Sequence, residues 1–362
     1  MSAVTTIPFA LGWPSPDLLP VKDIAAAVAR ALERDPGGAL GYGAPEGYAP
    51  LREWVAARYE VPVSRVILTN GSLQGLALVS EHLFGKSGGR AVVEGPTYDR
   101  TLLTLRRFGA TVEGVPLESD GIDVAALERS LKQGAPRLLY LIPNFQNPAG
   151  STMNRAKRER VVALAAEHGF LVFEDDPYRD VRFEGEDLPT MLSMDRADRV
   201  LFATSFTKTV APGVRIGALV LPESLIAPVK RLALDTYIAP THLAEATVAE
   251  YCRAGRFEVG LQHIRSALRA RRDALVTAID TCFGKRAQYV KPEGGYFLWM
   301  RLPGVDVDAA ADRATAAGVP FVKGSSCYVD QRGRDELRLA FSAVQPADIG
   351  PGIERLAAVL LA

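Results

Sequence analysis

The residue of this sequence most suited to covalent chemistry is a lysine that follows a buried segment. Lys208 comes after the apolar run 200–203, stands among the hydroxyl side chains of the segment 205–209, and has Arg215 seven residues after it. A lysine that is desolvated beside another cation has a lowered pKa and can form a Schiff base. The hydroxyls, that of Ser205 included, and the Arg215 guanidinium could hold a dianionic phosphate. An isolated loop lysine is most often solvated instead, so the chemical hypothesis depends on the residues around Lys208.

Three consecutive acids close another apolar segment. Glu174, Asp175 and Asp176 follow the run 170–173, and charges at the end of a buried strand cost solvation energy unless a cation faces them. A metal ion is one candidate, but none of the 4 histidines is spaced as a ligand pair with these acids, so we expect no metal site. The protonated nitrogen of a buried cofactor is the better partner. The alternative is a solvated strand end that leads into an acidic helix start.

Two further loops carry residues that suit ligand binding. In the segment 69–74, free N–H groups at a helix N-terminus and the Ser72 hydroxyl would make an anion site, although a simple N-cap at Ser72 or Asn70 is the commoner explanation. In the segment 144–150, Asn147 precedes a proline and is confined to extended geometry, which can aim its amide into a site; a plain turn is the alternative. Walker and G-x-G-x-x-G motifs are absent, so the sequence lacks the fingerprints of nucleotide-binding folds.

The elements that must position these loops form an α/β pattern. Short apolar runs predict buried strands, and the amphipathic stretches between them predict helices. The strands are expected at 66–68, 91–93, 138–142, 170–173, 200–203 and 216–221, and the helices at 73–84, 98–108 and 154–168. Such alternation predicts a mostly parallel sheet covered by helices on both faces, with ligands bound at the carboxyl ends of the strands.

After about residue 222 the pattern changes, and a second, smaller α+β domain is expected. Its helices are predicted at 243–255, 257–283 and 308–317, and a terminal helix is expected to end at 361. Strand segments are predicted in 288–301 and 336–341. The helix 257–283 carries a basic face formed by Arg265, Arg269, Arg271 and Arg272. We interpret this face as solvated and assign it no function.

Taken in order, these loops resemble those of the class I/II aminotransferases, which are fold-type I pyridoxal-phosphate (PLP) enzymes. The similarity is greatest to the branch that contains 2-aminoadipate and aromatic aminotransferases. It is carried by the strings IPNFQNPAG, FEDDPY, SFTKTVAPGVRIG and PEGGYFLWMRLP and extends from Phe9 to Ser342. The resemblance implies a large cofactor domain over residues 36–255, with a mostly parallel, seven-stranded-type sheet sandwiched by helices. It implies a smaller α+β domain that combines residues 1–35 and 256–362.

The resemblance also implies a role for each residue of the cofactor site. Lys208 would form the Schiff base and move the proton between substrate and cofactor. Asp175 would pair with the protonated pyridine nitrogen, which keeps the ring an electron sink. Tyr178 and Asn147 would hydrogen-bond to the phenolic oxygen of the ring, and Tyr98 would stack on its face. The phosphate would be bound by Ser72, Leu73, Gln74, Ser205 and Arg215.

Substrate and partner contacts are implied in the same way. Arg338 would clamp the substrate α-carboxylate beside Asn147, a task that suits a planar guanidinium. Trp13 stands where relatives have an aliphatic residue and could bias the pocket toward bulky or aromatic side chains. Tyr42 matches a family tyrosine that reaches the phosphate of the partner subunit, which implies a homodimer with shared active sites. The chain departs from the family at Leu73, where relatives have glutamine, and at Lys323, where they have proline and where we expect a solvated side chain.

These residues predict an aminotransferase that moves the α-amino group of an amino acid, possibly aromatic or 2-aminoadipate-like, to a 2-oxo acid. A PLP-dependent lyase, decarboxylase, cyclase or oxidase would use the same cofactor contacts and stays an alternative. A transcription regulator with a fused winged helix is not expected, because the matching region begins within ten residues of Met1 and because Lys208 is present.

The composition agrees with an enzyme that acts on small molecules. In 362 residues, 42 Lys and Arg balance 42 Asp and Glu, so no net positive charge is available for binding a nucleic acid. No apolar stretch reaches the length of a membrane span, and the first residues lack the pattern of a signal peptide. The 3 cysteines are too few and too scattered for a disulfide framework and indicate a reducing, cytoplasmic location.

Overall fold

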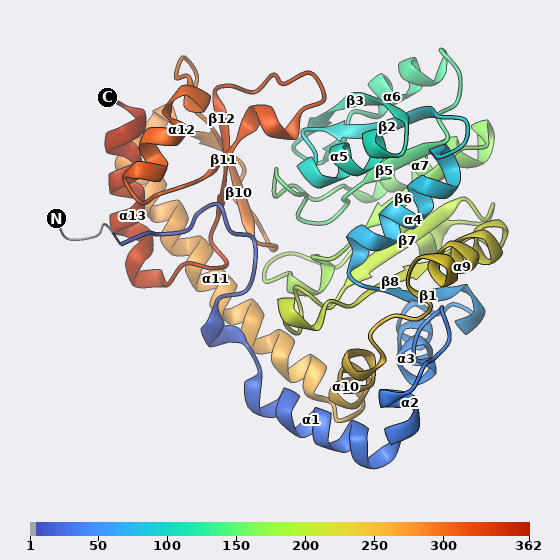
Figure 1. Ribbon diagram of the computed structural model, residues 1–362. Helices are drawn as coiled ribbons and strands as arrows, with labels where there is room; N and C mark the ends of the chain where they lie inside the picture. The colour runs from blue at the N-terminus through green and yellow to red at the C-terminus, as the bar shows by residue number, and fades with distance from the viewer. Residues whose placement is uncertain (1–4) are drawn as a thin grey trace.

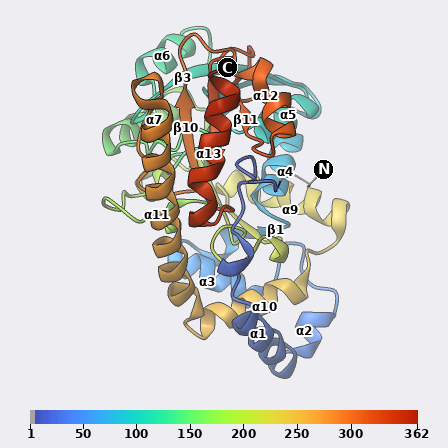
Figure 2. The same cartoon turned by 90° about the vertical axis from the view of Figure 1, so that its left-hand side faces the viewer.

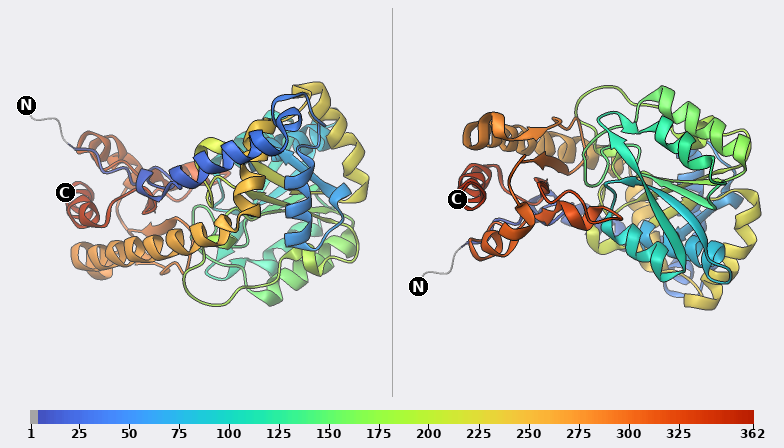
Figure 3. Two further views of the ribbon diagram at one scale, coloured as in Figure 1. Left: turned by 90° about the horizontal axis from the view of Figure 1, so that it is seen from below. Right: turned by 90° about the horizontal axis from the view of Figure 1, so that it is seen from above.

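The computed structural model describes residues 5–362 and consists of two bodies, each built around its own sheet (Figure 1). The larger sheet has eight strands in the order β1-β8-β7-β6-β5-β2-β3-β4, and the smaller has four in the order β11-β12-β10-β9. The two bodies lie side by side and are joined by the long helix α11 (Arg256–Phe283) and by the N-terminal segment (Figure 3). The predicted α/β class with a smaller α+β part is confirmed.

The direction of the strands in the larger sheet explains where its ligand-binding edge lies. They are β1 (Val66–Thr69), β2 (Gly89–Gly95), β3 (Ala110–Glu118), β4 (Gly121–Ile122), β5 (Leu138–Leu141), β6 (Leu171–Asp175), β7 (Val200–Ser205) and β8 (Gly217–Val220). β3, β2, β5, β6 and β7 run parallel, whereas β8 is antiparallel to both of its neighbours. The carboxyl ends of the parallel strands therefore meet at one edge, and the loops after β2, β5, β6 and β7 start there.

The strands β3 and β4 have no counterpart among the apolar runs of the sequence. Along β3, buried positions such as Ala110 and Val115 are separated by exposed or half-buried ones. A continuous apolar run marks a strand that is buried on both faces, and β3, next to the edge of the sheet, is not one. The two-residue strand β4 pairs back on β3 and adds a short eighth strand to the expected seven-stranded arrangement.

Helices cover both faces of the larger sheet (Figure 3). Local signals set their ends: α7 begins after Asn154, whose side chain accepts a hydrogen bond from the Lys157 amide, and it ends at Gly169 with a φ of 76°. The predicted helix 154–168 is thereby confirmed. The helices of this body are α2 (Pro36–Leu40), α3 (Ala49–Tyr59), α4 (Ser72–Phe84), α5 (Asp99–Arg107), α6 (Val124–Leu131), α7 (Arg155–His168), α8 (Met191–Met194), α9 (Glu223–Tyr237) and α10 (His242–Arg253). Because α9 packs on α4 and α10 on α3, the change of pattern after residue 222 does not mark the start of the smaller body.

The smaller body packs its helices on one face of its sheet, with α11 and α13 side by side (Figure 2). Besides α11 it contains β9 (Gln288–Tyr289), β10 (Phe297–Arg301), α12 (Val307–Ala316), β11 (Val322–Lys323), β12 (Glu336–Ala340) and α13 (Pro346–Leu360). The N-terminal segment adds to its edge, since the Ala340 amide donates to the Phe9 carbonyl at 2.7 Å. The helix α1 (Val21–Arg34) then packs on α10, where Arg34 pairs with Glu250 at 2.9 Å. Within residues 5–362, no helix is long and apolar enough to cross a membrane.

Two arginines of α11 are buried, so the prediction of a solvated basic face is wrong for them. Arg271 and Arg272 are 1% and 0% exposed. Arg271 donates to the Ser342 carbonyl at 2.7 Å and to Asp17 at 2.9 Å, and Arg272 donates to Glu184 at 2.6 Å. These guanidiniums therefore tie α11 to the N-terminal segment and to the loop after β6. Helical periodicity reveals a charged face, but it does not reveal what packs against that face.

Replacing Arg271 by alanine is expected to lower the free energy of unfolding by about 3 kcal/mol, because the buried groups that it satisfies lose their donor. Chemical denaturation followed by circular dichroism measures the change. Arg269→Ala is the matched control on the same helix: its side chain is 58% exposed, and the expected change is within about 0.5 kcal/mol. Equal losses in both variants would contradict the structural role of Arg271.

Candidate active site

The predicted lysine lies between the two bodies, where the loop after β7 faces the N-terminal segment. Lys208 Nζ donates to the Gly12 carbonyl at 2.6 Å and lies 5.7 and 5.4 Å from the ring centroids of Tyr178 and Tyr296. The Tyr296 hydroxyl donates to the Lys208 carbonyl at 2.6 Å and so fixes the backbone there. Burial, assisted by the positive charges of Arg338 and Arg215, lowers the pKa of Lys208 to about 7. A neutral amine is therefore available near neutral pH.

Asp175, at the end of β6, is the acid that faces the same space. It is 8% exposed, and one carboxylate oxygen accepts a hydrogen bond from the Tyr140 hydroxyl at 2.6 Å. The other oxygen, Oδ1, is buried with no hydrogen-bond partner among residues 5–362. Burial is the main cause that raises the pKa of Asp175 to about 7, and the nearby Asp176 adds to it. Because buried acceptors are normally satisfied, this oxygen suits a cationic N–H donor from a ligand.

The other two acids of the cluster point elsewhere, because side chains alternate along a strand. Glu174 accepts hydrogen bonds from the amides of Met191 and Leu192, both at 2.9 Å, at the start of α8. Asp176 accepts from Asn144 at 2.8 Å. All of these carboxylates are buried, so the alternative of a solvated strand end is wrong. Asp176 Oδ1 is also without a hydrogen-bond partner among residues 5–362. The charge of Lys208 acts on Asp175 and not on Asp176, so Asp175 is the acid that faces the lysine.

Arg338 on β12 reaches from the smaller body to the same site. Its Nη1 donates to Asn147 Oδ1 and its Nη2 donates to the Ala10 carbonyl, both at 2.8 Å. The guanidinium carbon lies 4.2 Å from the centroid of the Phe297 ring. Its Nε is buried without a hydrogen-bond partner in the described part of the chain. The arginine is thus held in place with donor capacity left for an anionic ligand.

Residues predicted to bind the phosphate come together at the N-terminus of α4. Ser72 is the first residue of this helix, and a Cβ at Gly217 would overlap its amide nitrogen, so the close approach of β8 requires glycine there. Arg215 Nη2 donates to the Asn70 carbonyl at 3.3 Å, which brings its charge to the same helix terminus. The Ser205 hydroxyl lies 2.9 Å from the Thr207 hydroxyl in the loop after β7. Free helix amides, hydroxyls and a guanidinium are the groups that bind phosphate.

Other residues predicted to bind the phosphate or the ring have partners of their own or exposed side chains. The Gln74 side-chain oxygen accepts a hydrogen bond from the Asn70 amide at 2.7 Å, so this oxygen already has a backbone partner before α4. Leu73 is 37% exposed. Tyr98 immediately precedes α5, and burial, with the charges of Asp99 and Asp175, raises the pKa of its hydroxyl.

Two predicted residues have exposed side chains. Tyr42 is 93% exposed, and Trp13 is 47% exposed at the end of the segment that contacts Lys208 and Arg338. The carbonyl of Trp13 accepts from the Ser342 hydroxyl at 2.8 Å. Lys323 is exposed, as expected.

Sequence reasoning missed the groups that orient the reactive side chains. Tyr140, which holds Asp175, lies inside an apolar run, where only its hydroxyl could have signalled a polar role. Tyr296 belongs to the string PEGGYFLWMRLP, which carries part of the family resemblance. That string does not indicate that the Tyr296 hydroxyl donates to the Lys208 carbonyl. The carbonyls of Ala10 and Gly12 carry no side-chain signal at all.

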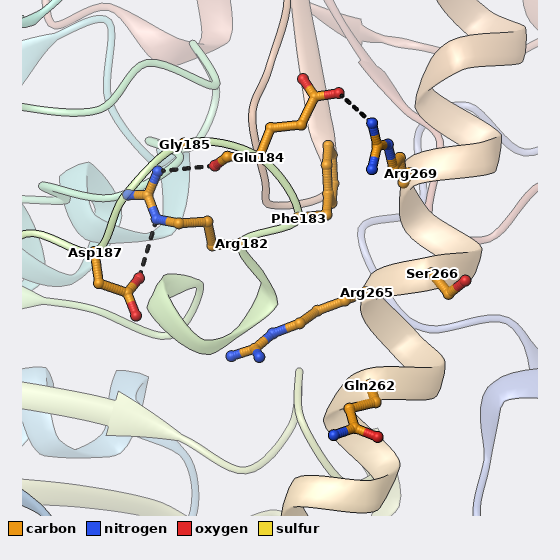
Figure 4. Close-up of a pocket in the computed structure, with 9 residues that line it drawn as sticks. All are labelled: Arg182, Phe183, Glu184, Gly185, Asp187, Gln262, Arg265, Ser266 and Arg269. Atoms are coloured by element: carbon orange, nitrogen blue, oxygen red, sulfur yellow. Dashed lines mark hydrogen bonds and ion pairs between the residues drawn. The ribbon is translucent and has the colours of Figure 1, made fainter.

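A separate cavity of about 500 Å³ opens between the loop 182–187 and α11, and Figure 4 shows the side chains that line it. Its charges largely neutralise one another: Arg182 pairs with Asp187 at 3.1 Å and Arg269 with Glu184 at 3.4 Å. None of the residues predicted for the cofactor site lines this cavity. We therefore do not assign it to the chemistry of Lys208.

Comparison with known proteins agrees with this geometry. The family model "Aminotransferase class I and II" matches residues 7–356. Aromatic-amino-acid aminotransferase 1 of Thermococcus litoralis is 33% identical over 97% of this chain and 87% of its own length. The 2-aminoadipate transaminase of Thermus thermophilus is 35% identical over 97% and 89%. The crystal structure of α-aminoadipate aminotransferase from Thermus thermophilus, complexed with N-(5'-phosphopyridoxyl)-L-leucine, superposes with a TM-score of 0.93 at 33% identity, covering 98% of this chain and 91% of that one.

The lowered pKa of Lys208 makes its reactivity depend on pH in a specific way. In the PLP-free protein, modification of Lys208 by an amine-reactive reagent is expected to rise through about pH 7, because only the neutral amine reacts. Exposed lysines have a pKa of about 10.4. Peptide mass spectrometry across a pH series measures the midpoint. Arg338→Met removes a neighbouring cation and is expected to move the midpoint upward. A midpoint near 10 in the unaltered protein would contradict the electrostatic account.

Proposed function

This chain belongs to the class I and II aminotransferases, and we propose that it moves the α-amino group of an aromatic or 2-aminoadipate-like amino acid to a 2-oxo acid. Its cofactor is PLP, whose ring supplies an electron sink for negative charge at the substrate Cα. The observation that carries the proposal is the buried lysine, with its pKa lowered to about 7, in one site with a buried carboxylate that keeps one oxygen unpartnered. In this proposal residues 36–255 form the cofactor domain, and residues 1–35 and 256–362 form the smaller one.

The residues of the site fit this cofactor. Asp175 Oδ1 would accept a hydrogen bond from the protonated pyridine nitrogen, which would satisfy the oxygen and favour its charged form. Asn147 gives its oxygen to Arg338 and keeps its Nδ2 for the phenolic oxygen, beside the Tyr178 hydroxyl. Tyr98 would stack on the ring face. The phosphate would be held by Ser72, Leu73 and Gln74 at the start of α4 and by Ser205 and Arg215 opposite.

Lys208 is proposed to move the proton that transamination requires. In its neutral form Nζ accepts a proton from the substrate Cα, and in its charged form it returns one, so a pKa near the working pH suits both directions. The Gly12 carbonyl orients Nζ, and the Tyr296 hydroxyl fixes the backbone that carries it. Because these contacts come from the smaller body and the N-terminal segment, the proton-moving group is positioned by both parts of the chain.

Substrate recognition is proposed to start from Arg338. A carboxylate placed at its buried, unpartnered Nε would satisfy that donor and add a charge-assisted hydrogen bond. Trp13 belongs to the segment whose Ala10 and Gly12 carbonyls contact the site, and its half-exposed indole would favour bulky or aromatic side chains. The relatives named for aromatic amino acids and for 2-aminoadipate support this choice of substrate class.

We propose that the enzyme is a homodimer with shared active sites. Leu40, the last residue of α2, is 67% exposed, and Tyr42 in the loop after it is 93% exposed; a second copy of the chain would cover both. In that dimer Tyr42 would reach the phosphate in the partner's site. Free cysteines at 252, 282 and 327 support a reducing, cytoplasmic environment.

Transamination is tested by its half-reaction. Adding an amino donor to the PLP-loaded enzyme is expected to replace the visible absorbance of lysine-bound PLP by the near-ultraviolet absorbance of pyridoxamine phosphate, and a 2-oxo acid is expected to reverse the change. Phenylalanine, tyrosine, tryptophan and 2-aminoadipate are compared with alanine and aspartate as donors. Release of ammonia or carbon dioxide without the pyridoxamine form would overturn the proposal and favour a lyase or a decarboxylase.

Lysine variants are the control for this assay. Lys208→Ala is expected to abolish multiple turnover and the visible absorbance of lysine-bound PLP. Lys323→Ala changes an exposed lysine of the smaller body and is expected to keep both. Multiple turnover by the Lys208→Ala enzyme would contradict the role of this residue.

A further inference from the structure

The loop that carries Tyr42 rests on a buried histidine that the proposed chemistry does not use. Tyr42 is 93% exposed, so its position depends on the backbone of its loop rather than on packing of its ring. His242, the first residue of α10, is only 8% exposed. A Cβ added at Gly43 would overlap the imidazole of His242, so the backbone next to Tyr42 lies directly on this ring.

Hydrogen bonding fixes how His242 supports the loop. Its Nδ1 lies 3.2 Å from the Gly38 carbonyl. A carbonyl oxygen can only accept, so Nδ1 carries a proton and donates it to this bond. The imidazole also meets the Tyr48 ring edge-on, with centroids 6.0 Å apart. His242 thus contacts α2 before Tyr42, the backbone directly after Tyr42, and Tyr48 at the start of α3.

Both ends of the segment 35–48, which contains α2 and the loop after it, are anchored. The Asp35 carboxylate caps α2 by accepting from the Gly38 amide at 2.9 Å. It also accepts from the Tyr48 hydroxyl at 3.0 Å, which joins the two ends of the segment. The Tyr48 amide donates to Glu245 at 2.8 Å, one turn along α10 from His242. The segment therefore has a fixed shape over α10, and Tyr42 stands at its free apex.

We propose that His242 is a positioning residue that presents Tyr42 to the active site of the partner subunit. The inference rests on the proposed homodimer, in which Tyr42 binds the phosphate of PLP across the interface. A tyrosine on a preformed loop loses less conformational entropy on binding than one on a loose loop. Replacing His242 is therefore expected to weaken PLP binding at the partner subunit's site. His242 contacts none of the residues around Lys208 in its own chain, so its own site is expected to keep its PLP affinity.

Mixed dimers separate the two sites. Chains with different affinity tags are co-expressed, and one chain carries Lys208→Ala, so only the other chain can form lysine-bound PLP. In the first arrangement His242→Ala is on the Lys208→Ala chain, which supplies Tyr42 to the remaining site. In the second it is on the chain that keeps Lys208. The dimer with Lys208→Ala alone is the reference, and PLP titration followed by visible absorbance gives the apparent Kd.

The first arrangement is expected to weaken PLP binding about tenfold, the size of a lost hydrogen bond to a charged group. The second is expected to match the reference. His242→Asn keeps a donor near the Nδ1 position and is expected to restore most of the affinity in the first arrangement. Equal weakening in both arrangements, or none in the first, would overturn the inference.

Tyr42→Phe in the same arrangements distinguishes failure of the inference from failure of the proposed function. If Tyr42→Phe on the Lys208→Ala chain weakens PLP binding and His242→Ala there does not, the shared site stands and the role of His242 is wrong. If neither variant acts across the interface, the shared-site homodimer is wrong as well. If the unaltered chain forms no lysine-bound PLP at all, the assignment of the cofactor site itself is overturned.

Discussion

Asp175 and Lys208 are both taken out of water between the two bodies, and burial moves their pKa values to about 7 from opposite directions. They are not hydrogen-bonded to each other: Asp175 accepts from Tyr140, and Lys208 donates to the Gly12 carbonyl. Arg338 adds a third buried charge, whose Nε has no hydrogen-bond partner within residues 5–362. Groups of this kind are costly without compensation, and a ligand with a cationic ring nitrogen, a phosphate and a carboxylate would compensate them. The remainder of the fold keeps these groups buried and apart from one another.

The scaffold achieves this separation through strand alternation and through contacts that cross between the bodies. Alternation on β6 sends Glu174 to the start of α8 and leaves Asp175 facing the site. Arg338 crosses from the smaller sheet to Asn147, and the buried Arg271 holds the N-terminal segment that covers Lys208. Each crossing contact is a directed hydrogen bond. The contacts of Arg338 and Arg271 therefore contribute to the relative placement of the two bodies.

Much of this arrangement could be predicted from the sequence, because it depends on local patterns. The apolar runs became β1, β2, β5, β6, β7 and β8, and the loops after the parallel strands carry Asn147, Asp175 and Lys208, as expected. The match of the family model confirms the family identified from the motifs. The roles of the individual site residues stay predictions.

What could not be predicted depends on contacts between distant segments. β3 alternates between buried and exposed positions and so lacks an apolar run. Arg271 and Arg272 have the spacing of a surface stripe, and only the packing of residues 17 and 184 against α11 buries them. The hydroxyl of Tyr140 meets Asp175 through the pairing of β5 with β6, a register that no single segment encodes.

One oxygen of the buried Asp175 carboxylate has no hydrogen-bond partner among residues 5–362, and we propose that it pairs with the cationic ring nitrogen of the cofactor. Difference infrared spectroscopy of carboxyl bands, with Asp175→Asn as the reference, measures the pKa of Asp175 in the PLP-free and PLP-loaded protein. The account predicts a pKa of about 7 without PLP, and a carboxylate that stays ionised below about pH 4 when the pyridinium is bound. The same pKa of about 7 in both forms would contradict it.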